Sequence, residues 1–485
     1  MISHSDQNAS GNSSAQAINQ AVKELGIRKL LSQCNVRKKN YDTESNSLGS
    51  CSVLSVFLFL ISLVFEGRNL FQFLNGKKGD EACSKNTYYR FLNNGRYNWS
   101  KFIIQLGAVV ASRFIALTRP ERISCLVLDD STIERLRSKK VELLSRVHDH
   151  NTNKFPKGFK LLMLNWTDGY SSIPVNFLVK TTTNSKKLIN GMKEDLDKRS
   201  NAYKTRVRAM MSNSDSAIEL ILQSLAAGVQ ASYLLADSWF ANEPFMHRVV
   251  TETGLHFIGM HRRYQEERFI YRGKTHILQW LGDLMMRNHP GNASIFGSIV
   301  VETKEFHMPI KLVFVRNRAN KSDYIILMST DCSLSAEEIV RLYGERWSIE
   351  CCFKACKSLF KLGREFQGLS YDLMVSSTAI ALTRYILIEW IRRKDNDLRS
   401  MCELFYVCCD DIQDMELATA LQTLVSIFFS GIKDGRVRID ETIHAELLKW
   451  YVTLPGFIKI LIPAFLDECE DAKALLGENL QGVPV

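Results

Sequence analysis

The sequence predicts a mixed α/β fold with helical regions at both ends, and three observations carry that prediction. Short apolar runs bounded by turn residues begin near residue 123 and predict five strands, at residues 123–128, 160–166, 173–179, 232–236 and 255–260. A long segment with helical periodicity separates the third strand from the fourth, and another helix begins at Phe240. Residues 21–118 and the residues after 372 have helical periodicity and no obvious strand, which indicates helices on both sides of a sheet core.

The N-terminal part of the chain divides into a tail and a basic helical region. Residues 1–20 are polar, contain no secretory signal and are expected to be a flexible tail. The region 21–118 is expected to be a helical DNA-binding domain. Residues 82–94 and a second helix from Trp99 form a pair that combines positive charge with aromatic surface, as a helix pair in a DNA groove would. An ordinary helical domain with a solvated basic face would show the same pattern.

A second change of pattern divides the rest of the chain. Residues 262–332 contain four further short strands, at 268–271, 298–302, 311–315 and 324–328, and are predicted to be a β-rich insertion. Ser335 and Glu338 fit a capping box and predict the start of a helix. The α/β core is therefore expected to comprise residues 119–261 and 333–385, followed by a C-terminal helical region at 386–485.

Composition limits the class of protein. Apolar residues make up 46% and charged residues 24% of the 485, which excludes global disorder. The net charge of +10 favours a polyanionic partner. Twelve cysteines without paired spacings indicate reduced thiols. The apolar run at residues 51–65 is shorter than the roughly 20 residues of a membrane span, so a buried helix is expected and a membrane function is the outlying alternative.

Acidic residues follow two of the predicted strands. Asp129 and Asp130 close the first strand, and Asp237 closes the fourth. Because the working groups of open α/β sheets collect beyond the carboxyl ends of strands, we expect these carboxylates to converge, with Glu350 joining them from a helix. Carboxylate oxygens prefer hard cations such as Mg²⁺, and two such ions can act on one phosphodiester.

A polar stripe is predicted on the helix that carries Glu350. Tyr343, Arg346, Glu350 and Lys357 lie within a stripe about 60° wide at helical spacing. Arg and Lys can hold phosphates there, although an ion pair between Arg346 and Glu350 would be the structural alternative. Five lysines after the first strand could also follow a duplex backbone or line a solvated loop: Lys139, Lys140, Lys154, Lys157 and Lys160.

These residues together resemble a known family. The strand ending in Asp130-Ser131-Thr132, the strand ending in Asp237, and the Y-R-E-K spacing from Tyr343 to Lys357 are similar to the bacterial insertion-sequence DDE transposases of insertion-sequence family four. The resemblance extends from about residue 120 to 385.

The resemblance implies a fold, an activity and partners. It implies an RNase H-like mixed sheet with a β-rich insertion between the second Asp and the Glu. It implies cut-and-paste transposition with two Mg²⁺ ions, for which Mn²⁺ could substitute, acting on terminal inverted repeats and target DNA in a synaptic homodimer. A bacterial, cytoplasmic and nucleoid-associated protein with no membrane role is then expected. The catalytic and metal-binding residues it implies are Asp130, Asp237 and Glu350.

Three questions stay open at this stage. Consecutive strand residues point to opposite faces, so either Asp129 or Asp130 is the first acid; the family pattern, with Ser or Thr directly after the acid, selects Asp130 with Asp129 as the alternate. Tyr343, Arg346, Lys357 and Trp347 are expected to bind DNA. Trp347, or Trp280 in the insertion, could stack on an extruded base. A related nuclease without strand transfer and a non-catalytic DNA-binding protein are the competing hypotheses.

Overall fold

The computed structural model describes residues 14–37, 51–76, 83–149, 153–262, 266–287, 294–317, 323–394, 400–401, 403–406 and 408–409. Contacts divide the chain into two compact units, one of residues 17–405 and one of residues 1–16 with 406–485. All elements that position the site belong to the first unit. Residues 1–13 of the predicted tail and residues 410–485 of the predicted C-terminal helical region lie outside the described residues.

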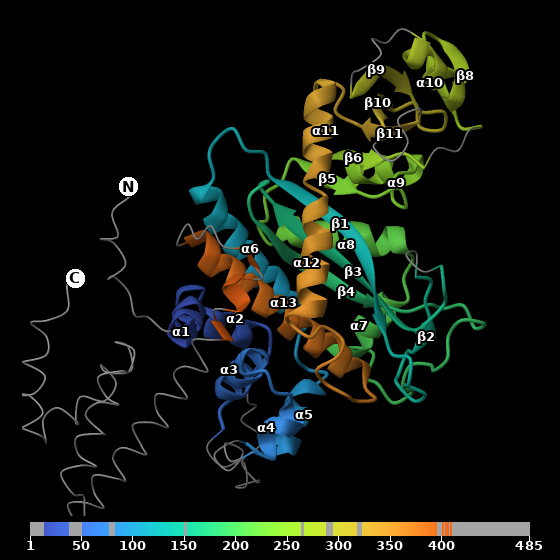
Figure 1. Ribbon diagram of the computed structural model, residues 1–485. Coiled ribbons are helices and arrows are strands. Elements are labelled where there is room, and N and C mark those ends of the chain that lie inside the picture. Colours follow the sequence, from blue (N-terminus) through green and yellow to red (C-terminus); the bar gives the residue numbers. More distant parts are fainter. Residues whose placement is uncertain are drawn as a thin grey trace, which may run out of the picture. The chain divides into compact units, whose positions relative to one another are not determined.

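Eleven strands form one mixed sheet within the described residues (Figure 1). The strand order is β2-β3-β1-β5-β6-β11-β10-β9-β7-β8, and β4 pairs with β3 beside β2. The strand bounds in the core are β1 Cys125–Glu134, β2 Ser145–Arg146, β3 Lys157–Thr167, β4 Ser172–Lys180, β5 Tyr233–Ala236 and β6 His256–Met260.

The direction of the core strands changes at β1. Strands β1, β3 and β4 are antiparallel neighbours, whereas β5 runs parallel to β1 and β6 runs parallel to β5. The five predicted core strands correspond to β1, β3, β4, β5 and β6, and the two-residue strand β2 was not predicted. The parallel neighbours β5 and β6 are joined by a crossover, as parallel strands must be, whereas the antiparallel strands β3 and β4 are joined by a tight turn at Gly169.

Helices cover the sheet. Every residue of β4 is buried, so both of its faces are covered. The long helix α6 (Trp99–Leu117) packs on β4 at Gly107, where an added Cβ would lie 2.8 Å from the Cα of Val175. Helices α7 (Asn201–Ala209), α8 (Asn213–Ala226) and α13 (Tyr371–Lys394) also contact β4. After β5, α9 (Glu243–Arg248) and a π-helical turn, η3 (Val249–Thr253), lead to β6.

The predicted insertion shares the sheet of the core. Strand β11 pairs with β6 of the core and leads on to β10, β9 and β7. Four strands agree with the predicted ones, namely β7 Arg268–Tyr271, β9 Ile295–Glu302, β10 Pro309–Arg316 and β11 Tyr324–Ser329. Strand β8 (Lys274–Ile277) and helix α10 (Leu278–Arg287) were not predicted.

The N-terminal region contains α1 (Ser14–Glu24), α2 (Ile27–Gln33), α3 (Val53–Ser62), a 3₁₀ turn η1 (Leu63–Glu66), α4 (Leu70–Leu74) and α5 (Lys85–Leu92). The apolar run at 51–65 forms α3 and η1 and buries one face in the fold. Two longer helices, α6 and α13, are apolar enough to cross a membrane, but the apolar window of α13 is wholly buried inside the protein, as in a core helix. A disulfide joins Cys51 to Cys83, so the prediction of reduced thiols was wrong for this pair.

The helix predicted to carry the polar stripe is interrupted. Helix α11 (Ala336–Gly344) begins at the predicted capping box of Ser335 and Glu338, and α12 (Trp347–Ser358) follows after a turn at 345–346. Gly344 weakens the helix at this point because glycine has a low helix propensity. Glu345 and Arg346 keep right-handed helical backbone angles, so α11 and α12 continue nearly in line (Figure 1).

Candidate functional site

Strand β1 carries two adjacent acids, Asp129 and Asp130, in its middle. The prediction that they close the strand was wrong, because β1 stays paired with β3 as far as Glu134. They lie instead where the parallel neighbour ends: the last pair between β1 and β5 is Leu128 with Ala236. Asp129 follows Leu128 within β1 and Asp237 directly follows the end of β5, which is why acids distant in sequence meet at this edge.

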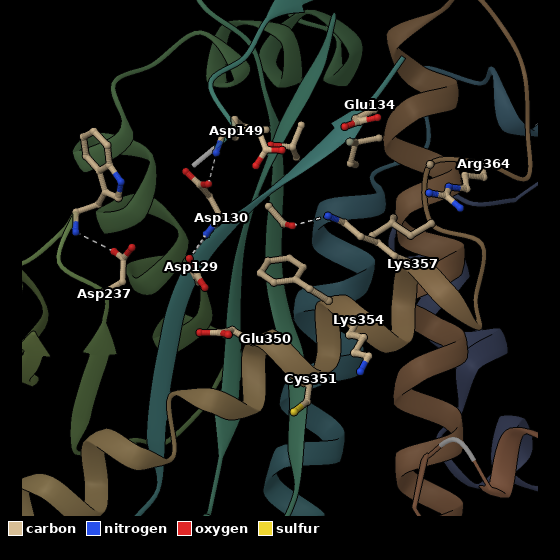
Figure 2. A pocket seen from close by; sticks show the side chains of 18 of the residues that line it. Asp129, Asp130, Glu134, Asp149, Asp237, Glu350, Cys351, Lys354, Lys357 and Arg364 are labelled. Atoms are coloured by element: carbon tan, nitrogen blue, oxygen red, sulfur yellow. Dashed lines mark hydrogen bonds and ion pairs between the residues drawn. The ribbon is translucent and has the colours of Figure 1, made fainter. Parts of the chain in front are cut away.

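The two acids of β1 face opposite sides of the sheet, as consecutive strand residues must. Asp130 accepts a hydrogen bond from Lys160 Nζ at 2.6 Å, which forms a largely buried ion pair on one side. Asp129 lies on the other side, with its Oδ2 atom 3.6 Å from Arg346 Nη1. Figure 2 shows the Asp129 carboxylate directed toward α12 and Glu350, and the Asp130 carboxylate directed away from them.

Asp237 follows β5 and shapes the loop to α9. Its Oδ1 atom accepts a hydrogen bond from the backbone N–H of Trp239 at 3.0 Å, and its carbonyl accepts one from the N–H of Phe240. An Asp that bonds to the backbone two residues ahead is typical of a turn, so Asp237 has a structural role as well. One carboxylate oxygen remains for other partners.

Glu350 lies in the first turn of α12, and Arg346 links it to β1. The guanidinium of Arg346 donates from Nη2 to Glu350 Oε1 and forms an ion pair with Asp129. It also lies 5.7 Å from the ring centroid of Tyr343. The structural alternative of an Arg346–Glu350 pair is therefore present, and the same guanidinium holds together residues from β1, α11 and α12.

The electrostatics of the site follow from crowded acids in a partly buried place. Burial, and secondarily the charge of Asp237, raise the pKa of Asp129 to about 7. Burial also raises the pKa of Asp237, to which the charge of Asp130 contributes. Burial raises the pKa of the Tyr343 phenol to about 12, so this side chain is a neutral hydrogen-bonding group at neutral pH. Asp237 is therefore close enough to both acids of β1 to repel them.

These groups line one cleft with a volume of about 1240 Å³. The cleft is larger than the roughly 300–1,000 Å³ of small-molecule sites, which suits a polymer better than a metabolite. Its polar lining includes all sequence-predicted site residues: Asp129, Asp130, Asp237, Tyr343, Arg346, Trp347, Glu350 and Lys357. Basic residues Lys160, Lys354 and Arg364 also line it.

The predicted DNA-binding residues differ in how firmly they are held. Lys357 donates from Nζ to the Oγ atom of Ser131 on β1 at 2.7 Å, and burial lowers the pKa of its ammonium group. Trp347 is 62% exposed at the start of α12. Trp280 does not line the cleft; its indole stacks on His276 with ring centroids 3.9 Å apart.

The carboxylates suit a divalent cation by their chemistry. They form an all-oxygen set of the kind that hard cations prefer, and a bound ion would relieve the repulsion that raises the pKa of Asp129 and Asp237. As the side chains lie, no three His, Cys, Asp or Glu residues in the described part of the chain are arranged to hold one ion. Lys160 and Arg346 instead neutralise the acids, so a cation would have to displace them.

Sequence reasoning missed three features of the cleft. For Lys160 a duplex contact and a solvated loop were both left open, but it lies in β3 and is bonded to Asp130. Ser131 was quoted only as part of a motif, yet it accepts the Lys357 hydrogen bond. Trp239 also lines the cleft and had not been considered. The strand register explains this pair, because Lys160 is opposite Thr132 and therefore lies diagonally opposite Asp130 on the same face of the sheet.

Part of the chain matches a family of known endonucleases. Residues 73–272 match the family model described as DDE superfamily endonuclease. This part of the chain is similar to a DDE superfamily endonuclease domain. The match includes the acids of β1 and Asp237, covers less than half of the chain and ends before Glu350.

Other comparisons add little. No curated protein matches the sequence. Among solved structures, a Drosophila P element transposase strand transfer complex matches with a TM-score of 0.22 and 10% identity, over 83% of this chain and 93% of that chain. A TM-score of this size carries no argument about fold or activity.

Proposed function

We propose that the protein is a DNA transposase that moves an insertion sequence by cut-and-paste, cleaving at terminal inverted repeats and joining the freed ends to target DNA. The observation that carries the proposal is the cleft itself, where acids from β1, from the end of β5 and from α12 share one surface with Tyr343, Arg346 and Lys357. The endonuclease match over residues 73–272 supports the cleavage chemistry.

The fold supports the same assignment. Three antiparallel strands followed by two strands parallel to the first, in the order β4-β3-β1-β5-β6, agree with an RNase H-like core. On this proposal residues 119–261 and 333–385 form the catalytic core, residues 262–332 the insertion and residues 21–118 a DNA-binding domain. The Y-R-E-K residues would assign the protein to insertion-sequence family four.

The acids would hold the cofactor. Two divalent cations, Mg²⁺ with Mn²⁺ as a substitute, would supply Lewis-acid activation of a water or a 3′ hydroxyl and stabilise the departing oxygen. Asp237, Glu350 and an acid of β1 would bind them, and the repulsion between Asp237 and the acids of β1 would favour binding. Lys160 and Arg346, released from the acids, would then be available to the DNA phosphates.

The first acid is either Asp130, which the family pattern selects, or Asp129. Asp129 is supported by its position beside Arg346 on the face of α12 and by its register with Asp237. Asp130 is supported by the Ser and Thr that follow it. Separate Asp129→Asn and Asp130→Asn variants distinguish them, because only the ligand variant should lose cleavage while still binding DNA ends.

The remaining cleft residues would position DNA. Arg346 can donate two parallel hydrogen bonds to a phosphate, Lys357 can contribute a point charge, and Tyr343 a neutral hydroxyl. Trp347 would contact DNA at the cleft rim, where it is exposed. Because two ends must be brought together, we propose that the protein acts on DNA as a homodimer. The family resemblance places it in the cytoplasm of a bacterium, associated with its nucleoid.

The test uses the full chain and DNA fragments from the two borders of its genomic element. Asp237→Asn and Glu350→Gln are expected to abolish Mg²⁺-dependent cleavage while end binding in a gel shift changes little. Glu337→Gln is the matched control, because Glu337 is an exposed acid in the first turn of α11. Cleavage that persists in both site variants would refute the assignment.

The second candidate is a nuclease with the same acids and no strand transfer. Precut ends incubated with a supercoiled plasmid separate the two functions, because only a transposase joins the ends to the plasmid. Joined products support the proposal, whereas cleavage of intact ends without joining supports the nuclease. Binding without either reaction would indicate a non-catalytic DNA-binding protein.

A further inference from the structure

Trp239 is an exposed indole at the edge of the cleft. It follows Asp237 by two residues, and its backbone N–H donates to the carboxylate of that acid at 3.0 Å. Its side chain is 48% exposed, whereas the next residue, Phe240, is only 5% exposed. The loop therefore anchors itself in the core through Phe240 and directs Trp239 to the surface of the cleft that Asp237 also lines.

A cation lies over this indole. The guanidinium of Arg262, just beyond the end of β6, is 3.9 Å from the Trp239 ring centroid. Arg262 is itself exposed. The loop is held further by Asn242, whose Oδ1 accepts the N–H of Phe245 and whose Nδ2 contacts the Trp239 carbonyl at 3.5 Å. The pair is thus a flat, positively charged surface fixed from both sides of the β5–β6 crossover.

This surface has the chemistry of a nucleobase-binding site. An exposed tryptophan alone would be unremarkable, because single apolar side chains are common on protein surfaces. Here the indole lines the same cleft as the acids and as Arg346 and Lys357, which on the proposed function hold DNA phosphates. Aromatic rings and guanidinium planes stack on unpaired bases, and the positive charge attracts the phosphate attached to such a base.

We propose that Trp239, supported by Arg262, stacks on an unpaired nucleobase beside the scissile phosphodiester. The inference rests on the proposed function and names a contact for it. Because Trp239 is bonded through its backbone to Asp237, a base on its ring belongs to a nucleotide at or next to the bond being cut. Stacking there stabilises a DNA end distorted for cleavage and holds it while the chemistry occurs.

Trp280 and Trp347, which the sequence suggested for stacking on a base, fit this role less well. Trp280 stacks on His276 outside the cleft lining. Trp347 does line the cleft and is more exposed than Trp239, but it precedes Glu350 on the helix side, next to Arg346. Trp239 alone of the three lies within two residues of a site acid and under a guanidinium.

The first experiment measures base unstacking. End DNA carries 2-aminopurine at each position flanking the cleavage site in turn, and binding is followed with Ca²⁺, so that binding can be separated from cleavage. Base extrusion raises the fluorescence, and stacking on an indole quenches it. We expect a position where Trp239→Ala changes the signal, Trp239→Phe largely preserves it, and Phe306→Ala, an exposed aromatic residue outside the cleft lining, leaves it as in the wild type.

The second experiment measures cleavage. Loss of one stacking contact predicts a cleavage rate about 5- to 150-fold lower for Trp239→Ala. An abasic nucleotide or a mismatch at the identified position should restore much of that rate, because the base then needs less energy to leave the helix. A structural defect of the loop would not be rescued in this way.

The outcomes separate the two proposals. Wild-type protein that neither cleaves nor joins DNA refutes the proposed function. Active wild-type protein with an unchanged Trp239→Ala variant, or with a loss that no abasic position rescues, overturns the stacking role alone. If Trp347→Ala, and not Trp239→Ala, changes the fluorescence and loses a cleavage rate that an abasic nucleotide restores, the stacking role of Trp239 is also overturned and the contact is assigned to α12.

Discussion

Arg206 is a fully buried cation of the core, as is Arg384, and replacing Arg206 should be severely destabilising. Its side chain has no exposed surface and donates to both oxygens of Glu142, at 2.7 and 2.8 Å, and to both oxygens of Asp372, at 3.0 and 2.7 Å. These bonds connect α7 to the loop before β2 and to the first turn of α13. Arg206→Met leaves two carboxylates without their cation.

The expected cost is about 3–5 kcal/mol in the free energy of unfolding, because removing one partner of a buried ion pair leaves uncompensated charge. Arg199→Met is the matched control, since its ion pair with Asp197 is 91% and 57% exposed and should contribute at most about 1 kcal/mol. Urea unfolding followed by circular dichroism and tryptophan fluorescence measures both differences.

The pH dependence gives an independent check. Burial opposes ionisation of Glu142, but the hydrogen bonds and charge of Arg206, together with the backbone N–H groups of Tyr371 and Lys193, outweigh it, so the pKa of Glu142 in the folded protein is lowered. Ionised Glu142 therefore stabilises the fold at pH values above its pKa in the unfolded chain. This stabilisation is lost as the pH falls through its pKa in the folded protein. In Arg206→Met the carboxyl should instead accept a proton readily, so the stability gap to wild type should shrink between pH 7 and about pH 4. A gap below about 1 kcal/mol at pH 7, or one that widens in acid, would refute the reasoning.

Three further predictions concern the site and the N-terminal region. Lys160→Met should raise the affinity for Mn²⁺ about 2- to 5-fold in an EPR titration, because it removes a competing cation from an acid of β1. Lys157→Met is the control and should leave the affinity unchanged. Equal affinities of Lys160→Met and the wild type would contradict this. Arg346→Lys keeps the charge but loses the forked geometry, so end cleavage should fall about 10- to 150-fold, and an unchanged rate would exclude a forked contact. Dithiothreitol should lower the unfolding temperature of the wild type but not of a Cys51→Ser/Cys83→Ser double variant; equal responses would speak against the disulfide.

The strands of the core could be predicted because their apolar runs are continuous and bounded by turn residues. The end of β1 could not, since Asp129 to Thr132 are polar and a polar run suggests a loop. These residues stay in the strand because β3 supplies hydrogen bonds along it, while β5 ends early and opens the cleft beside them. Strand β8 has neither apolar alternation nor a buried face, so its sequence carried no signal.

The sequence predicted which residues line the site better than it predicted how their side chains are arranged. Helical spacing brought Tyr343, Arg346, Glu350 and Lys357 to one side, and the near-helical turn after Gly344 preserved that arrangement despite the break. Whether a tryptophan is packed or exposed depends on tertiary structure, so Trp239 gave no indication of its place. The ion pairs of the acids depend on side-chain contacts between β1, β3 and α12 that spacing alone does not specify.

The central claim is that the acids of β1, Asp237 and Glu350 surround shared divalent ions. Iron-mediated cleavage of the polypeptide tests it most directly: Fe²⁺ with ascorbate and peroxide cuts the backbone near bound iron, and mass spectrometry locates the cuts. The account predicts cuts close to residues 129–131, 237–239 and 349–351 together, suppressed by excess Mg²⁺ and lost in Asp237→Asn. Cuts confined to one of these segments, or only elsewhere in the chain, would contradict it.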